Sequence, residues 1–143
     1  MKFTIPGAPC GKGRPRFARR GQFTRAYTPA KTANYENLVV LEFQNAGGTY
    51  LGDKIPVKVR IDAYYEIPKS TSKKTFREMV ANLVFPTKKP DWDNIGKIVC
   101  DALNGIAYKD DAQIVDGHVV KHYSEVPYTE VLIEEVKRES LFD

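Results

Sequence analysis

The chain has 143 residues, a length typical of one domain, and 42% of them are hydrophobic and 28% charged. This composition fits a soluble globular protein and is too apolar for a disordered chain. No apolar run of about 18 residues is present, so no membrane span is expected. The N-terminal residues lack the apolar segment of a secretion signal. Cys10 and Cys100 are far apart, which predicts reduced thiols in a cytoplasmic protein, with Cys100 a small core residue.

The net charge of +4 is unevenly distributed along the chain. Residues 1–31 carry eight basic residues and no acidic residue, a net charge of +8. Residues 32–143 carry 14 basic and 18 acidic residues, a net charge of −4. A basic arm on a mildly acidic body suggests a polyanionic partner near the N-terminus. It does not indicate what is done to that partner.

The first third of the chain predicts a strand, a loop and a helix. Lys2–Pro6 alternates polar and apolar residues, which is typical of a short strand. Residues 7–27 are rich in glycine, proline and arginine without periodicity, so we expect a long basic loop that is functional or mobile. Thr28-Pro29 predicts a helix start with Thr28 as the cap, and Gly47-Gly48 predicts its end.

The middle of the chain predicts a strand and two helices. Residues 57–66 alternate apolar and polar side chains, which indicates a strand with one buried face. Residues 70–83 predict a short helix capped by serine or threonine. Apolar residues from Ile95 to Ile106 follow the helical i, i+3, i+4 spacing, with Asp93 expected as the N-cap and Asn104-Gly105 as the end.

Two further strands are expected near the end of the chain, at residues 113–123 and 129–137. The intervening turn around Pro127 suggests that they form an antiparallel hairpin. The whole order predicts a small α+β protein, a single domain over residues 1–143, with a mixed sheet packed against helices.

Acidic residues gather around the third predicted helix. Asp91 and Asp93 flank Trp92, and Pro90 favours an extended residue before it, so both carboxylates should project from a loop-to-helix corner. Lys97 lies one helical turn after Asp93, and Asp101 lies one turn further on the same face. If the following chain runs antiparallel to this helix, Asp110 and Asp111 return beside Asp91 and Asp93.

Each of these residues alone has a simpler interpretation. Asp93 could serve only as a cap, Lys97 only as an i, i+4 partner, and Asp110-Asp111 only as a turn. Together, however, three or four carboxylates would repel one another by roughly 4 kcal/mol for each pair at 4 Å. Mg²⁺ is a hard cation that would compensate them. The pattern therefore favours metal-assisted hydrolysis of a phosphodiester, and a nucleic-acid-binding domain with a capped helix is the alternative.

Three motifs follow one another within residues 89–115: Lys-Pro-Asp-Trp-Asp-Asn-Ile-Gly-Lys, Asp-Ala-Leu-Asn-Gly and Asp-Asp-Ala-Gln-Ile-Val. Together with the opening Pro-Gly-Ala-Pro at residues 6–9 and the basic run at 12–17, they resemble the RusA family of Holliday junction resolvases. This resemblance implies a RusA-like fold and a small homodimeric endonuclease, often prophage-encoded, that needs Mg²⁺ or Mn²⁺. It also implies binding to four-way DNA junctions and paired symmetric nicks, in DNA recombination and repair.

The resemblance also implies roles for individual residues. The catalytic acids would be Asp91, Asp93 and Asp111, and the catalytic lysine would be Lys97. The same three acids would hold the metal, with Asp110 ranked below Asp111 as a ligand. From the charge pattern and the resemblance, we expect DNA contacts from a set of basic residues: Lys12, Arg14, Arg16, Arg19, Arg20, Arg25, Lys88 and Lys89.

Some assignments stay open at this point. A branched-DNA-binding protein without cleavage activity is the alternative function. No organic cofactor and no membrane partner are expected, and the cytoplasm of a bacterial or phage-infected cell is the expected location. Trp92 could stack on a base or anchor the helix start. His118 and His122 share one face of a predicted strand, where satisfied or solvent-facing histidines are favoured over metal ligands. Aromatic residues between the arginines of residues 16–27 fit stacking on nucleic acid.

Overall fold

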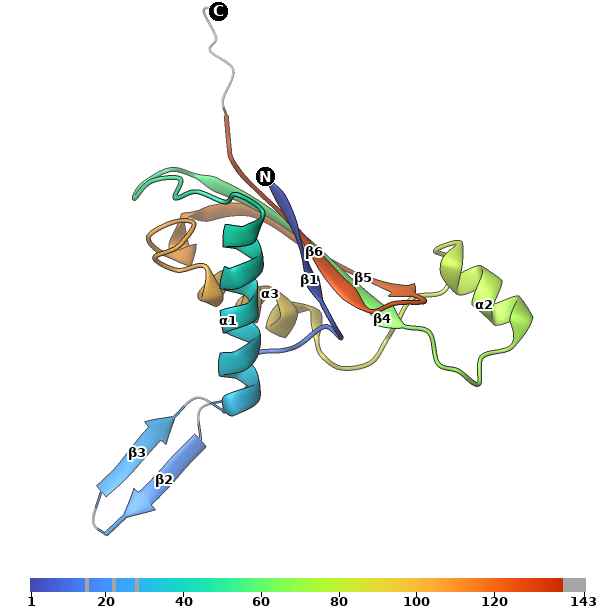
Figure 1. The fold of residues 1–143 in the computed structure, drawn as a ribbon, viewed down its shortest axis with the longest axis horizontal. Coiled ribbons are helices and arrows are strands. Elements are labelled where there is room, and N and C mark those ends of the chain that lie inside the picture. Colours follow the sequence, from blue (N-terminus) through green and yellow to red (C-terminus); the bar gives the residue numbers. More distant parts are fainter. Residues whose placement is uncertain (15, 22, 28, 138–143) are drawn as a thin grey trace, which may run out of the picture.

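A four-stranded mixed sheet forms the centre of the protein (Figure 1). The structure, a computed structural model, describes residues 1–14, 16–21, 23–27 and 29–137. The sheet contains β1 (Lys2–Pro6), β4 (Val57–Glu66), β5 (Ile114–Ser124) and β6 (Tyr128–Glu135), in the spatial order β1-β6-β4-β5. Strand β4 is parallel to β5 and antiparallel to β6, which in turn is antiparallel to β1. This arrangement confirms the predicted α+β class and the mixed sheet.

The prediction of a hairpin between the last two strands is wrong. β5 and β6 do run in opposite directions, but β4 lies between them and pairs with both. Two strand spacings amount to about 10 Å. The chain from Ser124 to Tyr128 can span more than that when extended. A short connection therefore does not require the flanking strands to pair, and it crosses the end of β4 here.

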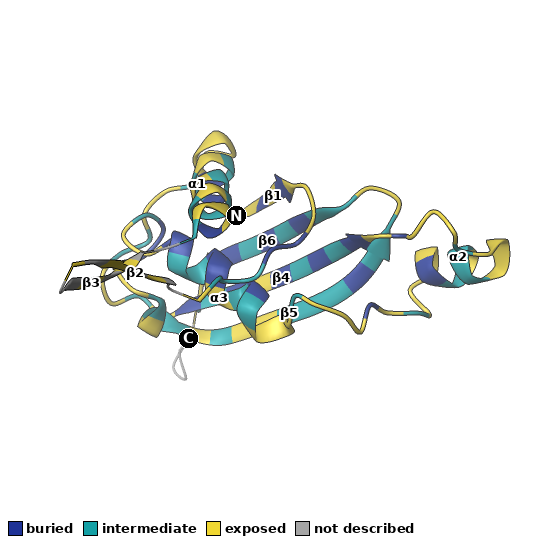
Figure 2. Cartoon of the chain, turned by 90° about the horizontal axis from the view of Figure 1, so that it is seen from below, coloured by how far each residue is buried: buried dark blue, intermediate teal, exposed yellow. Residues whose placement is uncertain are grey.

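Burial follows the predicted alternation in β4. Every second side chain from Val57 to Tyr65 is buried, and the intervening side chains lie on the opposite face of the sheet (Figure 2). The helices α1 (Ala30–Asn45) and α3 (Trp92–Ala102) pack over the buried face. In α3, Gly96 allows a close approach to β5, because a Cβ at this position would lie 3.2 Å from Cγ2 of Val119.

Helix ends differ from the predicted ones by a few residues. The N-cap of α3 is Asp91 rather than Asp93, because the backbone is still extended at Asp91. The short helix α2 covers only Lys73–Val80, and its N-cap Ser72 accepts a hydrogen bond from the backbone N–H of Thr75. Pro29 is the N-cap residue of α1, and the predicted cap Thr28 lies outside the described residues.

Residues 7–27 are not the continuous loop that we expected. They contain a two-stranded antiparallel hairpin, β2 (Arg16–Arg20) and β3 (Phe23–Tyr27), which projects away from the sheet (Figure 1). Gly21 in its turn has a φ of +59°, a conformation that glycine adopts readily. Phe17 on the hairpin is 70% exposed. The other described side chains of the two strands, Arg19, Thr24 and Ala26, are exposed as well. Apolar alternation marks strands with one buried face, and the sequence carries no clear signal of that kind here.

The two cysteines are free, with Cys10 buried and Cys100 half-buried against the core. Among the described residues, no helix is both long and apolar enough to cross a membrane.

A conservative change in β4 should measure how much the core packing contributes. Ile61 is 1% exposed and pairs with Val119 and Val131 on the two neighbouring strands. We expect Ile61→Val to lower the free energy of unfolding by about 0.5–1.5 kcal/mol, because it removes one buried methylene. The matched change Val115→Ala, at a residue that is 65% exposed, should alter it by less than about 0.5 kcal/mol. Urea denaturation of both variants measures this, and equal losses would contradict the burial of Ile61.

Candidate active site

Asp91, Trp92 and Asp93 form the predicted corner between a loop and a helix. Asp91 is the N-cap of α3 with φ −68° and ψ 151°, and its carboxylate makes no capping hydrogen bond. Asp93 follows in the first helical turn. Both carboxylates are exposed, and Trp92 between them is 64% exposed. The side chains are therefore available to a ligand rather than used up in holding the helix.

Two surface hollows meet at this corner. One, of about 550 Å³, is lined by Asp91, Trp92 and Asp93 together with Thr87, Lys88, Lys89 and Lys121. The other, of about 960 Å³, lies between the N-terminal segment and the corner. Its charged lining residues are Lys12, Arg14, Lys31, Lys89 and Asp91. Asp91 and Lys89 line both hollows, so the carboxylate of Asp91 lies between two surfaces rich in basic residues.

A polar stripe continues along α3 from the corner. Asp93, Lys97 and Asp101 are spaced four residues apart and therefore lie on one face of the helix. Asp101 is half-buried, with its carboxylate 3.4 Å from Nζ of Lys12. The same ammonium lies 2.9 Å from Glu36 on α1. Lys12 thus ties the N-terminal segment to both helices through ion pairs.

Asp111 lies beside Asp101. Burial raises the pKa of Asp111, and a hydrogen bond with Asp101 and the negative charges of Asp101 and Asp110 raise it further, while nearby Lys97 lowers it. Asp110 is instead used as a cap. Its carboxylate accepts from the backbone N–H of Ala112 at 3.0 Å, and Gln113 completes the capping box.

The expected convergence of Asp111 with Asp91 and Asp93 is not found. The chain after α3 returns beside the last turn of the helix, so Asp111 meets Asp101 there rather than the two acids at the helix start. In the described ranges, no three His, Cys, Asp or Glu side chains have a spacing that could hold a metal ion. The structure thus places Asp91 and Asp93 along one hollow and Asp111 beside Asp101.

Comparison with known proteins places this geometry in a family. Residues 6–134 match the family described as endodeoxyribonuclease RusA. The chain belongs to the RusA family. It is also similar to a protein of Bacillus subtilis (strain 168) whose name is "Uncharacterized protein YqaN". The two are 42% identical over 139 residues, which cover 95% of this chain and 96% of that protein. The family confirms the resemblance seen in the sequence and makes this chain an endodeoxyribonuclease, an enzyme that hydrolyses phosphodiester bonds in DNA.

RusA resolvases are generally metal-dependent nucleases, so the acids of this chain are expected to fit a divalent cation. They do not form a three-carboxylate site. Mg²⁺, however, needs only one or two carboxylates when waters and phosphate oxygens complete its shell. The exposed pair Asp91 and Asp93 has this donor chemistry, and neither carboxylate is used in capping α3. In the second part of the site, burial and then the neighbouring Asp101 raise the pKa of Asp111.

The basic residues expected to contact DNA in this RusA-family chain differ in their surroundings. Arg14, Lys88 and Lys89 are exposed around the two hollows. Lys12 lines the larger hollow but is held in its ion pairs. Arg19 is exposed on β2 and donates from Nε to the carbonyl of Gly21. The side chains of three other predicted contacts lie outside the described part of the structure: Arg16, Arg20 and Arg25.

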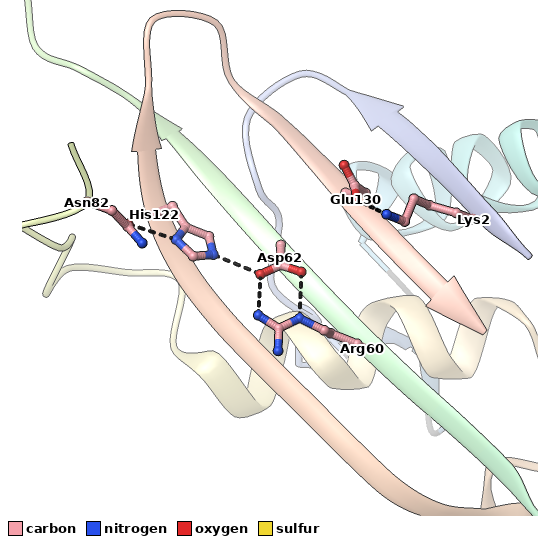
Figure 3. A network of polar contacts seen from close by, with 6 residues as sticks. All are labelled: Lys2, Arg60, Asp62, Asn82, His122 and Glu130. Atoms are coloured by element: carbon pink, nitrogen blue, oxygen red, sulfur yellow. Dashed lines mark hydrogen bonds and ion pairs between the residues drawn. The ribbon is translucent and has the colours of Figure 1, made fainter. Parts of the chain in front are cut away.

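The two histidines lie on the face of the sheet opposite to the one that α1 and α3 cover. His122 is buried, with one ring nitrogen 2.8 Å from Asp62 and the other 3.0 Å from Asn82 (Figure 3). Burial alone would raise the pKa of Asp62, but hydrogen bonds with Arg60 and His122 outweigh it and lower the pKa. His118 is exposed beside Asp116. One histidine is therefore satisfied and the other faces solvent, as the sequence favoured.

Sequence reasoning missed three residues of this region. Tyr65 donates its hydroxyl to the carbonyl of Pro90, but in the sequence it is only one more apolar position of an alternating strand. Lys121 lines the smaller hollow from β5, far from the acidic motif in the chain. Gln113 donates from Nε2 to the carbonyls of Gly52 and Ile55 and so fixes the turn that carries Asp111. In the sequence, only the position of Gln113 in the Asp-Asp-Ala-Gln motif indicated that it matters.

Proposed function

We propose that this RusA-family endonuclease binds four-way DNA junctions and resolves them by paired symmetric nicks, with Mg²⁺ as the metal ion and Mn²⁺ as a substitute. The observation that carries the proposal is that the exposed Asp91 and Asp93 line one lysine-lined hollow and that Asp91 also lines a second one beside it. Carboxylates next to a basic surface suit a reaction on a phosphate backbone, since the basic residues attract the phosphates that the acids alone would repel.

Each group of residues has a distinct task in this mechanism. Arg14, Lys88 and Lys89 contact the phosphates on either side of the corner and bring one strand to Asp91 and Asp93. Asp91 and Asp93 are the proposed catalytic acids that would hold the metal ion, and Asp111, beside Asp101 at the last turn of α3, is the third proposed catalytic acid. Lys97, on the same helix face as Asp93, stabilises negative charge that develops on the phosphate. When bound, Mg²⁺ supplies polarisation of a phosphoryl oxygen and a lower pKa for the attacking water.

A homodimer suits the substrate. A four-way junction presents two equivalent strands, and a single site cuts only one of them at a time. A protein with two-fold symmetry matches a substrate with the same symmetry, as repressor dimers match palindromic operators. We further propose a role in DNA recombination and repair, a prophage origin and a location in the cytoplasm of a bacterial or phage-infected cell.

A cleavage assay tests the function directly. The protein is incubated with an end-labelled four-way junction, a Y-fork or a linear duplex, each in Mg²⁺, in Mn²⁺ or in EDTA. We expect paired nicks at symmetric positions of the junction in either metal, and no nicks in EDTA. Binding of the junction without nicking in any divalent ion would instead support the alternative, a branched-DNA-binding protein without catalytic activity.

The contribution of the basic residues around the two hollows can be measured from the salt dependence of junction binding. We expect Arg14→Ala and Lys89→Ala each to weaken junction binding and to reduce the slope of log K against log salt by about 0.9, because one phosphate contact is lost. Lys54→Ala is a matched control, since Lys54 is exposed in the loop before β4 and lines neither hollow. Binding isotherms at several salt concentrations give the slopes, and slopes equal to that of the parent protein would rule out phosphate contacts at these two residues.

A further inference from the structure

Two side chains from neighbouring strands hold the chain just before Asp91. Tyr65 of β4 donates its hydroxyl to the carbonyl of Pro90 at 2.7 Å. Lys121 of β5 donates its ammonium to the carbonyl of Lys88 at 2.5 Å. The two carbonyls flank Lys89, and Pro90 directly precedes Asp91 in the chain. The sheet therefore anchors the corner at two points within three residues of the first carboxylate.

Tyr65 and Lys121 also support each other. The register pairs Ala63 with Lys121 and Tyr65 with Tyr123, so Lys121 and Tyr65 are diagonal neighbours on one face of the sheet. Nζ of Lys121 lies 5.0 Å from the centroid of the Tyr65 ring, within range of a cation–π interaction. Burial, with a contribution from the charge of Asp91, raises the pKa of Tyr65 to about 12. Its hydroxyl thus remains a donor at neutral pH.

The N-terminal segment fixes the corner from another direction. A Cβ at Gly11 would lie 3.0 Å from Cβ of Pro90 and 3.2 Å from Cβ of Asn94, so only glycine fits there without a shift. The backbone N–H of Lys12 donates to the carbonyl of Asn94 at 3.2 Å. Packing from this segment and hydrogen bonds from the sheet therefore both act on the backbone around Asp91.

We propose that Tyr65 and Lys121 are positioning residues that hold Asp91 and Asp93 in place for strand cleavage. The inference rests on the proposed function, because it assigns these two acids to the reaction. Neither Tyr65 nor Lys121 needs to touch the reacting atoms. They act indirectly, through their hydrogen bonds to the carbonyls of Pro90 and Lys88. Residues that do not contact the substrate can still affect a reaction by orienting the residues that do.

Trp92 provides a readout that is independent of catalysis. It is the single tryptophan of the chain and lies between the two acids, so its fluorescence anisotropy and its quenching by acrylamide report on the corner alone. The variants are Tyr65→Phe, Lys121→Met and the conservative Lys121→Arg. Tyr35→Phe is the matched control, because it removes another largely buried hydroxyl, one that lies 3.4 Å from Thr129. Each variant is measured for Trp92 anisotropy, junction Kd and single-turnover nicking rate, with thermal unfolding as a check of folding.

We expect Tyr65→Phe and Lys121→Met to lower the anisotropy of Trp92 and to slow nicking by about 10–100-fold, with junction Kd changed less than about threefold. Lys121→Arg should restore most of the rate, and Tyr35→Phe should leave all three quantities unchanged. Unchanged anisotropy and nicking in Tyr65→Phe would overturn the proposal. So would a Lys121→Met variant with weakened binding and unchanged anisotropy, since that result assigns Lys121 to direct DNA contact. Failure of the parent protein to nick any DNA would refute the proposed function instead, and the anisotropy would still show whether the two residues hold the corner.

Discussion

Asp91→Asn should reduce junction nicking by about two to three orders of magnitude while junction binding stays the same or becomes tighter. The substitution keeps the size of the side chain and removes a negative charge that faces the phosphate backbone. The substitution should not weaken the start of α3, because the carboxylate of Asp91 makes no capping hydrogen bond. Asp93→Asn should behave in the same way. Nicking rates under single-turnover conditions and a gel-shift Kd separate the chemistry from binding.

Asp116→Asn is the matched control for this loss. It makes the same change of charge on β5, beside His118 and away from the corner. We expect its nicking rate to lie within about twofold of the parent rate, which is the size of effect expected for a surface change away from special features. Normal cutting by Asp91→Asn, or an equal loss in Asp116→Asn, would show that the corner is not the catalytic site.

Asp111→Asn should reduce junction nicking about as much as Asp91→Asn does. It should also make the folded protein more stable at neutral pH. The pKa of Asp111 is raised in the folded protein, through burial and through its contact with Asp101. A raised folded pKa means that stability is lost as the pH rises through that pKa. Asparagine does not ionise, and its amide donates a hydrogen bond to Asp101. The variant should therefore have the higher Tm at pH 7.

The advantage of Asp111→Asn should shrink as the pH falls towards the ordinary aspartate pKa of about 3.9, since the parent side chain becomes protonated as well. Thermal unfolding at intervals from pH 7 to pH 3.5 gives the trend. Glu125→Gln, at an exposed residue of the turn between β5 and β6, controls for the loss of one negative charge. A variant that is less stable than the parent at pH 7 would contradict the repulsion inferred between Asp101 and Asp111.

The sequence predicted features that depend on local pattern. The alternation in β4 and the apolar spacing in α3 both correspond to real faces of the core, because each pattern matches the period of its element. The corner at Asp91 was predictable for the same reason, from a proline followed by acids at a helix start. The helix N-cap was misplaced by two residues, since Asp91 and Asp93 are equally good capping residues.

Pairing across the chain was not predictable in the same way. Nothing in the composition of β5 and β6 shows that β4 inserts between them, and Asp111 meets Asp101 because of where the turn at Gln113 is anchored. The hydroxyl of Tyr65 and the ammonium of Lys121 reach the corner only once β4 and β5 are paired. Contacts that carry the site thus depend on register, which single-sequence periodicity does not contain.

The position of β6 has a consequence for how the protein reaches its folded state. β1 pairs with β6 and not with β4, although β1 is the first and β6 the last of the strands in the described residues. During synthesis the N-terminal strand therefore has no partner until β6 has left the ribosome. Contacts between such distant segments require closure of a large loop before they contribute stability, which slows folding. We expect the sheet to close late, as one cooperative step completed by its C-terminal strand.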